Sequence, residues 1–208
     1  MRGTCYIVGA GDVSPRGLHP QKGDLLIAAD GGYGALRALK LRPDVVVGDM
    51  DSWPKPIAGV PLLRYPVRKN DTDLSLAIKL GYRRGYRRFR LFGVTGGPRE
   101  DHFLAALQLM GGWSAKGCQL RLIDRRFNIY TLTDDSLLIP AKAGQVVSVF
   151  SHSRHSRGVS LRGLDYEADD LPLSHHFPLG VSNAGTKCGR ALIGVEKGTL
   201  LVYVQTDD

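Results

Sequence analysis

The sequence predicts an α/β fold, a mostly parallel sheet with helices on both faces, followed by a small all-β sandwich domain. From residue 5 to residue 132, short apolar strands alternate with segments of helical period. That alternation is typical of parallel strands joined by helices. Beyond Thr133 the helical period disappears, and Gly, Pro and Asp separate short strands. We therefore expect an α/β catalytic domain at 1–130 and a β-sandwich domain at 131–208.

The elements expected in the first half follow from runs of apolar residues. The expected strands read CYIVGAG, DLLIAADGG, PDVVVGDMDS, PLLRYPV, RFRLFGV and QLRLIDRRFNIYTL. Three consecutive valines in the third suit a strand that is buried on both faces. Helices are expected at YGALRALKL, near residues 72–84, and at DHFLAALQLM. In the second of these helices, Leu74, Ala77 and Ile78 place an apolar stripe on one side.

The second half contains β signals throughout. The expected strands lie in QVVSVFSH, GVSLRGLDYEA and RALIGVEKGTLLVYVQ, and the last contains a hairpin signal at Glu196, Lys197 and Gly198. The boundary between the halves is expected within residues 128–140. Because no repeat or long flexible linker separates the halves, we expect them to pack closely.

Composition restricts the class of protein. The chain of 208 residues has 43% hydrophobic and 23% charged residues, which is ordinary for a soluble globular protein. No apolar run has the length of a membrane span, and the first residues lack the apolar core of a signal peptide. The cysteines Cys5, Cys118 and Cys188 are few and far apart. This pattern predicts buried thiols in a reducing, cytoplasmic compartment and no membrane partner.

The net charge of +8 favours an anionic partner. Its densest source is YRRGYRRFR, residues 82–90, where tyrosine and phenylalanine alternate with arginine. This segment fits a nucleic-acid-binding patch. It fits better as a helix end, where cations suit the helix dipole, followed by Gly85 and the next strand. A basic surface also attracts a nucleotide polyphosphate, so charge alone does not choose between these partners.

Acidic residues follow several expected strands. Asp49 and Asp51 come directly after the valine strand, and side chains two apart in an extended segment point to the same side. Asp30 follows another strand, Asp71 and Asp73 lie where a helix should start, and Asp101 lies at a further strand-to-helix turn. Each one alone fits a helix cap or a turn. Their recurrence at one sheet edge, where α/β proteins bind ligands, predicts a site.

A divalent cation would explain these carboxylates. Two carboxylates about 4 Å apart repel by about 4 kcal/mol at an effective dielectric of about 20. Oxygen donors indicate Mg²⁺ rather than zinc. Mg²⁺ keeps several waters and takes one or two protein carboxylates when phosphates also bind, so the six aspartates cannot all bind one ion. The others act through water, orient neighbouring groups or accept a proton.

The turn TGGPR contains groups that can bind an anion. Backbone N–H groups at Gly96 and Gly97 can face a phosphate, and Arg99 can make a forked contact with its oxygens. The Gly-Lys-Ser/Thr ending of a Walker motif is absent, so the chain is not an ordinary P-loop kinase.

These motifs together resemble the thiamine pyrophosphokinase (thiamine diphosphokinase) family. The matching segments are ADGG, PDVVVGDMDS, KNDTDLSLAI, GVTGGPREDH and GVSNAG, in the order of the family, over residues 29–185. The resemblance implies an α/β domain followed by a β-sandwich. It also implies homodimers with active sites between subunits. The implied reaction is ATP plus thiamine giving thiamine diphosphate plus AMP, with Mg²⁺.

The resemblance also implies roles for individual residues. The metal and catalytic positions are Asp49, Asp51, Asp71 and Asp73, with Arg99 as a further catalytic residue. The ATP-binding positions are Asp30, Gly31, Thr72, Thr95, Gly96, Gly97, Arg99, Asp101, His102 and Asn128. The thiamine-binding positions are Ser182 and Asn183. The chain departs from the family where Pro98 precedes Arg99, which shifts the guanidinium by one residue.

Two alternatives remain open from the sequence. One is another Mg²⁺-dependent nucleotidyl or phosphoryl transferase on the same scaffold, with a different acceptor. The other is a basic nucleic-acid-binding module, which leaves the acidic strand ends unexplained because they would repel phosphates without a metal.

Overall fold

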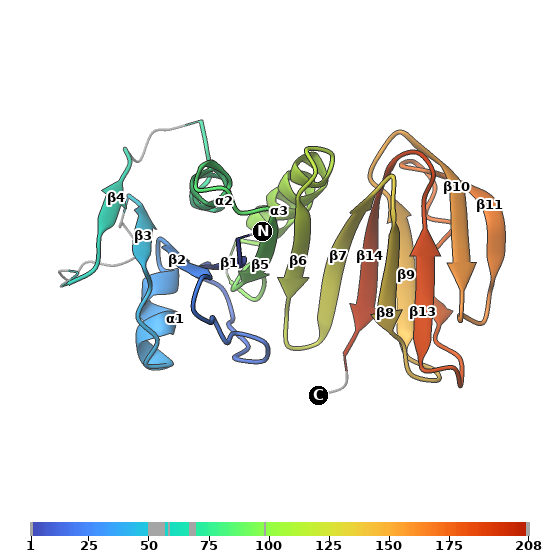
Figure 1. The fold of residues 1–208 in the computed structure, drawn as a ribbon, viewed down its shortest axis with the longest axis horizontal. Helices are drawn as coiled ribbons and strands as arrows, with labels where there is room; N and C mark the ends of the chain where they lie inside the picture. Colours follow the sequence, from blue (N-terminus) through green and yellow to red (C-terminus); the bar gives the residue numbers. More distant parts are fainter. Residues whose placement is uncertain (1, 50–56, 58, 67–69, 98, 207–208) are drawn as a thin grey trace. The chain divides into compact units, whose positions relative to one another are not determined.

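A computed structural model describes residues 2–49, 57, 59–66, 70–97 and 99–206 (Figure 1). The chain forms two compact units. The first comprises Met1–Leu109 and Leu122–Arg125, and the second comprises Met110–Arg121 and Arg126–Asp208. The assignment of catalytic and thiamine-binding roles to residues 1–130 and 131–208 stays a prediction.

A parallel sheet forms the centre of the first unit. Its strands run in the order β5-β1-β2-β3-β4, and every pairing between them is parallel. Their bounds are β1 (Thr4–Val8), β2 (Leu25–Ala29), β3 (Val45–Gly48), β4 (Leu62–Arg64) and β5 (Arg88–Phe92). Val45, Val46 and Val47 are buried, as expected for a central strand. Because the strands are parallel, their carboxyl ends lie at one edge, and residues that follow them are neighbours there.

Helices cover both faces of this sheet. They are α1 (Gly32–Ala38), α2 (Asp73–Arg83) and α3 (Glu100–Ser114). Successive strand residues point to opposite faces. Tyr6 packs in one cluster with Leu36 of α1, whereas the preceding Cys5 lies against Gly81 of α2 together with Phe89. The predicted α/β fold with helices on both faces is thus confirmed for this unit.

The basic segment YRRGYRRFR is the end of α2 and the start of β5. Gly85 has a φ of +90°, which allows the chain to turn out of the helix. Arg87 stacks over the Tyr82 ring at 3.8 Å and donates hydrogen bonds to the carbonyls of Tyr82 and Tyr86. The arginine therefore closes the helix end, as the favoured interpretation predicts.

The second unit contains two packed layers of antiparallel strands. Their orders are β12-β9-β14-β7 and β11-β10-β13-β8. The bounds are β7 (Phe127–Thr133), β8 (Ser136–Pro140), β9 (Val146–Ser151), β10 (His155–Arg162), β11 (Ala168–Ser174), β12 (Asn183–Ala184), β13 (Arg190–Gly194) and β14 (Thr199–Gln205). One apolar core contains Val149 and Val202 from the first sheet and Leu161 and Ile193 from the second. This confirms the predicted β-sandwich.

Two details differ from the expectation. The segment 119–132, expected as one strand, forms β6 (Gln119–Ile123) and β7. The polar residues Asp124, Arg125 and Arg126 interrupt the apolar pattern, and the chain leaves the strand there. Cys5 and Cys118 are buried, but Cys188 is exposed, so the expectation of buried thiols is wrong for that residue. Within the described residues, none of the helices has the length and hydropathy needed to cross a bilayer.

Two adjacent glycines near the end of α3 differ in their surroundings. A Cβ on Gly111 would lie 2.1 Å from Cδ2 of the His152 ring, whereas a Cβ on Gly112 would meet nothing within 4 Å. Burial, and secondly the neighbouring His175, lower the pKa of His152. The packed ring is therefore held toward its neutral form.

We expect Gly112→Ala to stabilise the protein by about 0.5–1 kcal/mol, because alanine has the higher helix propensity. Gly111→Ala should destabilise it by about 1–3 kcal/mol through overpacking against His152. Urea denaturation of the two variants measures the difference. The double change Gly111→Ala with His152→Ala should relieve the steric part of that loss. Equal stabilisation by both single alanine substitutions would contradict the packing.

Candidate active site

Three aspartates converge at the carboxyl edge of the parallel sheet. Asp30 follows β2, Asp49 follows β3, and Asp73 is the first residue of α2. One carboxylate oxygen from each lies within 4.8 Å of the others. The three residues come from separate segments of the chain, and the parallel order of β2 and β3 places two of them side by side.

The backbone between these strand ends explains the close approach. The N–H of Asp30 donates to the carbonyl of Val47 at 2.8 Å, which ties the end of β2 to β3. Gly48 has a φ of +154°, and a Cβ there would lie 3.1 Å from the Cα of Asp30. Glycine at this position therefore lets the chain turn and lets the Asp30 backbone approach. This turn places Asp49 beside Asp30.

The electrostatics of this trio fit a divalent cation. The three carboxylate oxygens lie within 4.8 Å of one another, and two unit charges at that separation repel by about 3.5 kcal/mol at an effective dielectric of about 20. Asp30 is only 8% exposed. Its buried Oδ1 has no hydrogen-bond partner among the residues that the structure describes. Oxygen donors in this arrangement suit Mg²⁺ and would have their repulsion offset by it.

The other residues predicted for the metal are placed differently. Asp71 accepts hydrogen bonds from Nζ of Lys79 at 2.5 and 2.7 Å and from the Ser75 hydroxyl at 2.9 Å. The bonds from Lys79 and then Ser75 lower its pKa. Asp71, which precedes α2, is therefore paired with side chains of that helix. Asp51 lies outside the described residues. The metal roles of both stay predictions.

Thr72 caps helix α2. Its hydroxyl accepts a hydrogen bond from the backbone N–H of Ser75 at 3.1 Å, which satisfies one of the free donors at the helix start. Gly31 occupies the corresponding position before α1 and has no side chain with which to cap it. Both residues shape the turns that carry Asp30 and Asp73, and their predicted contacts with ATP stay predictions.

Two glycine-containing loops lie side by side at the ends of β1 and β5. Backbone N–H groups of the first loop donate to carbonyls of the second, from Gly11 to Gly93 at 2.9 Å and from Asp12 to Thr95 at 2.8 Å. The Thr95 hydroxyl donates to Oδ2 of Asp124, a carboxylate that is 6% exposed. Gly96 and Gly97 continue the second loop toward α3. The predicted ATP turn is thus held by the backbone N–H of Asp12 and by the carboxylate of Asp124.

Arg99 and Asp101 form an exposed ion pair before and at the start of α3. Nε and Nη2 of Arg99 donate to the two carboxylate oxygens of Asp101 at 2.9 and 2.7 Å. This contact lowers the pKa of Asp101 to about 2. His102 is also exposed, one residue further along α3. The Nη1 group of Arg99 is not used in this ion pair and can donate to a phosphate. Pro98 lies outside the described residues.

The segment predicted to bind thiamine lies in the second unit. Asn183 is buried, and its amide clamps the backbone of Tyr166, accepting from the N–H at 3.0 Å and donating to the carbonyl at 2.7 Å. The Tyr166 ring is 75% exposed. Ser182 has a φ of +60°, and its N–H donates to the Ser148 hydroxyl at 3.0 Å. Asn183 thus shapes a segment that displays an aromatic ring.

Asn128 lies on β7 in the second unit and is 4% exposed. Its Oδ1 has no hydrogen-bond partner among the described residues. The side chain therefore lies in the interior, and its predicted contact with ATP stays a prediction.

Sequence reasoning left out Asp12, Asp124 and Tyr166. Asp12 and Asp124 follow β1 and β6, so the rule that identified Asp30 and Asp49 would have found them. The signal for Tyr166 is weaker, because an exposed aromatic cannot be recognised before burial is known.

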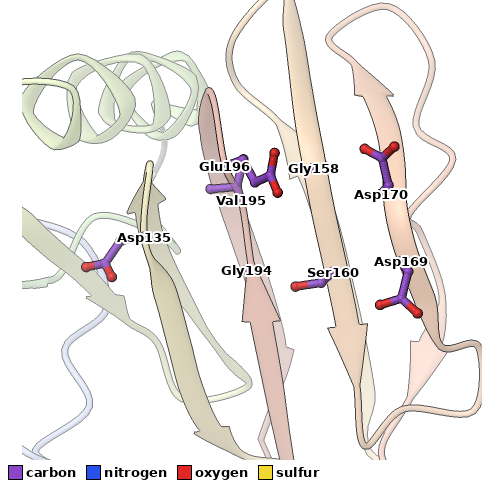
Figure 2. A pocket seen from close by; sticks show the side chains of 8 residues that line it. All are labelled: Asp135, Gly158, Ser160, Asp169, Asp170, Gly194, Val195 and Glu196. Atoms are coloured by element: carbon purple, nitrogen blue, oxygen red, sulfur yellow. The ribbon is translucent and has the colours of Figure 1, made fainter.

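A shallow pocket of about 450 Å³ opens on the sheet β11-β10-β13-β8 (Figure 2). Its acidic residues are Asp135, Asp169, Asp170 and Glu196. Figure 2 shows Glu196 and Asp170 on either side of the strand that carries Gly158. Asp169 pairs with Arg162. None of the site residues predicted from the sequence lines this pocket.

Comparison with known protein families identifies the family to which this fold and site belong. The model of the thiamin pyrophosphokinase catalytic domain matches residues 19–122, half of the chain. The chain belongs to this family. The matched region contains Asp30, Asp49 and Asp73. The resemblance identified from the motifs, and the expectation of an enzyme of this type, are confirmed.

Individual relatives are similar over nearly the whole chain. A thiamine pyrophosphokinase of Bacillus subtilis strain 168 is 27% identical over 190 residues, covering 88% of each chain. A crystal structure of thiamine pyrophosphokinase from Bacillus subtilis superposes with a TM-score of 0.88 at 24% identity, covering 99% of this chain and 100% of the other. The enzyme from Candida albicans gives 0.78 at 14% identity, covering 98% and 90%. The structural matches show the same fold.

We expect Asp30→Asn to raise the melting temperature of the metal-free protein, because it removes one of three repelling charges. A gain of about 1 kcal/mol corresponds to about 2–4 °C for a chain of this size. The same variant should lose most of the stabilisation that millimolar Mg²⁺ gives the parent protein.

Thermal denaturation with and without Mg²⁺ measures both effects. The control is Asp135→Asn, which removes an exposed charge in the second unit. It should leave the response to Mg²⁺ unchanged. A parent protein with no Mg²⁺ response, or an Asp30→Asn variant with the full response, would refute the metal assignment.

Proposed function

We propose that the chain transfers pyrophosphate from ATP to the hydroxyl of thiamine, giving thiamine diphosphate and AMP, with Mg²⁺ as cofactor. The convergence of Asp30, Asp49 and Asp73 at the carboxyl edge of the sheet carries this proposal. Three carboxylates placed in this way can bind the Mg²⁺ that accompanies a reacting polyphosphate. Membership of the thiamin pyrophosphokinase family supports thiamine as the acceptor.

The trio would hold the metal, with Asp51 and Asp71 as the further positions predicted from the sequence. When bound, Mg²⁺ neutralises charge on the phosphoryl oxygens. The protein's own contribution is alignment, since phosphoryl transfer needs little covalent help. Arg99 adds a guanidinium that can leave Asp101 for a phosphate oxygen.

In the proposed reaction, the thiamine hydroxyl oxygen forms a bond to the β-phosphorus of ATP. The bond from that phosphorus to the oxygen bridging it to the α-phosphorus breaks, and AMP leaves with the bridging oxygen. The hydroxyl proton passes to a carboxylate, for which Asp71 and Asp73 at the start of α2 are the candidates. The hydrogen bond from Lys79 lowers the pKa of Asp71, which disfavours proton transfer to it.

The thiamine side of the site is proposed to lie around Ser182 and Asn183. Asn183 fixes the backbone of Tyr166, and the exposed Tyr166 ring offers a face to a cationic or aromatic heterocycle. We further propose a cytoplasmic homodimer with active sites between subunits. Exposed Phe177, Leu179 and Val181 supply apolar surface for such an assembly.

Product analysis with ATP, thiamine and Mg²⁺ tests the reaction. We expect AMP and thiamine diphosphate in equal amounts. Formation of ADP, or no reaction of thiamine, would favour a transferase with a different chemistry or acceptor. Asp73→Asn should lower kcat by about a hundredfold or more, because it alters the trio. The control Asp135→Asn should retain full activity. A well-folded Asp73→Asn variant with normal kcat would remove the trio from the mechanism.

We expect Tyr166→Ala to raise KM for thiamine about tenfold and to leave KM for ATP unchanged, because a stacking contact contributes about 1 kcal/mol or more. Tyr166→Phe should retain near-normal KM, since the ring face remains. Steady-state kinetics in both substrates measure this. The control Phe177→Ala removes another exposed ring from the same unit. Equal effects of the two alanine substitutions would exclude a specific role for Tyr166.

A further inference from the structure

Asp124 determines what the Thr95 hydroxyl can offer to a ligand. Asp124 is 6% exposed and follows β6, and its Oδ2 accepts a hydrogen bond from the Thr95 hydroxyl. An ionised carboxylate only accepts hydrogen bonds, so the single proton of Thr95 is committed to it. The Thr95 oxygen therefore presents only lone pairs to anything bound in its loop. It can accept a hydrogen bond and cannot donate one.

This polarity suits a nucleoside better than a phosphate. Phosphate oxygens carry negative charge and lone pairs, which the Thr95 oxygen would repel, whereas ribose hydroxyls are donors. Asp12 lies on the same turn, since a Cβ on Gly96 would be 2.2 Å from its Oδ2. Carboxylates at sheet edges bind ribose hydroxyls in dinucleotide folds.

The order of the strands separates this turn from the aspartate trio. Thr95 follows β5, whereas Asp30 and Asp49 follow β2 and β3 in the order β5-β1-β2-β3. Neighbouring strands lie about 4.8 Å apart, so the two places are about 10–14 Å apart along one edge. One extended nucleotide can reach from sugar to terminal phosphates over such a span. The phosphates then lie toward the trio and the sugar toward Thr95.

We propose that Asp124 is a positioning residue that makes Thr95 a hydrogen-bond acceptor, and that Thr95 and Asp12 bind a ribose hydroxyl of the nucleotide. This inference rests on the proposed function in one respect, that the chain binds ATP. It gives roles to Asp12 and Asp124, neither of which the sequence motifs mark. It also makes the turn at Gly96 a sugar-binding turn, in place of the phosphate contact predicted from the sequence.

Binding of nucleotides with Mg²⁺ and without thiamine tests the inference by titration calorimetry. The ligands are ATP, 2′-deoxy-ATP, 3′-deoxy-ATP and purine riboside triphosphate, which lacks the 6-amino group. The parent protein should bind at least one deoxynucleotide about tenfold more weakly than ATP, the effect of one lost hydrogen bond. Thr95→Val, Asp124→Asn and Asp12→Asn should reduce this ratio toward one. A merely structural role would lower stability and leave the ratio unchanged.

Thr131→Val is the matched control. Thr131 is a buried threonine of the second unit whose hydroxyl bonds the backbone of Leu120, and its loss should leave the ratio intact. If Asp124→Asn fails to fold, the affinity ratio of Asp12→Asn still tests the inference, because Asp12 is exposed and its substitution should not prevent folding. Equal binding of ATP and both deoxynucleotides by the parent protein overturns the inference, as does a ratio unchanged in all three variants. A loss confined to the riboside lacking the amino group also overturns it, because the donor is then the base.

Failure of the proposed reaction gives a different result. A protein that distinguishes ATP from its deoxy analogues through Thr95, but forms no AMP with thiamine, supports this inference and refutes thiamine as the acceptor. Formation of AMP with equal use of ATP and both deoxynucleotides supports the reaction and refutes the sugar-binding turn.

Discussion

The repulsion between carboxylates gathered at one sheet edge is the constraint on which the first unit depends. Asp30, Asp49 and Asp73 bring oxygens within 4.8 Å of one another, and the folding of the sheet must offset this cost. The buried strands β1, β2, β3 and β5 supply the apolar core that does so. A protein keeps such an arrangement when a bound cation and its phosphates recover the free energy.

The same edge divides into two regions of different chemistry. At β2 and β3, the carboxylates face one another and suit a cation. At β1 and β5, the Thr95 hydroxyl donates a hydrogen bond to Asp124, and backbone hydrogen bonds join the two loops. Strand order fixes the spacing between these regions, because each strand adds about 4.8 Å. In the proposed binding mode, a long, charged substrate contacts both regions, with its reacting phosphates near the trio.

The second unit uses a buried amide for a comparable purpose. The amide oxygen and the amide nitrogen of Asn183 both hydrogen-bond the backbone of Tyr166. These bonds satisfy a buried polar group and fix the segment that displays the ring. Asn183 thus supports the Tyr166 segment, and its predicted contact with thiamine stays a prediction. Family motifs mark a residue as important without separating direct contact from support of a neighbour. The hydrogen bonds of the folded chain make that distinction.

The sequence by itself determined the fold class, the acidic strand ends and the family. Strand and helix periods are local, and parallel order alone predicts that residues following Ala29 and Gly48 share an edge. Tertiary structure decided which aspartates meet. Asp71 pairs with Lys79 of α2, whereas Asp30 joins the trio, where Gly48 leaves room for its backbone. Side-chain partners depend on distances of a few ångströms between separate segments, and sequence spacing does not encode those distances.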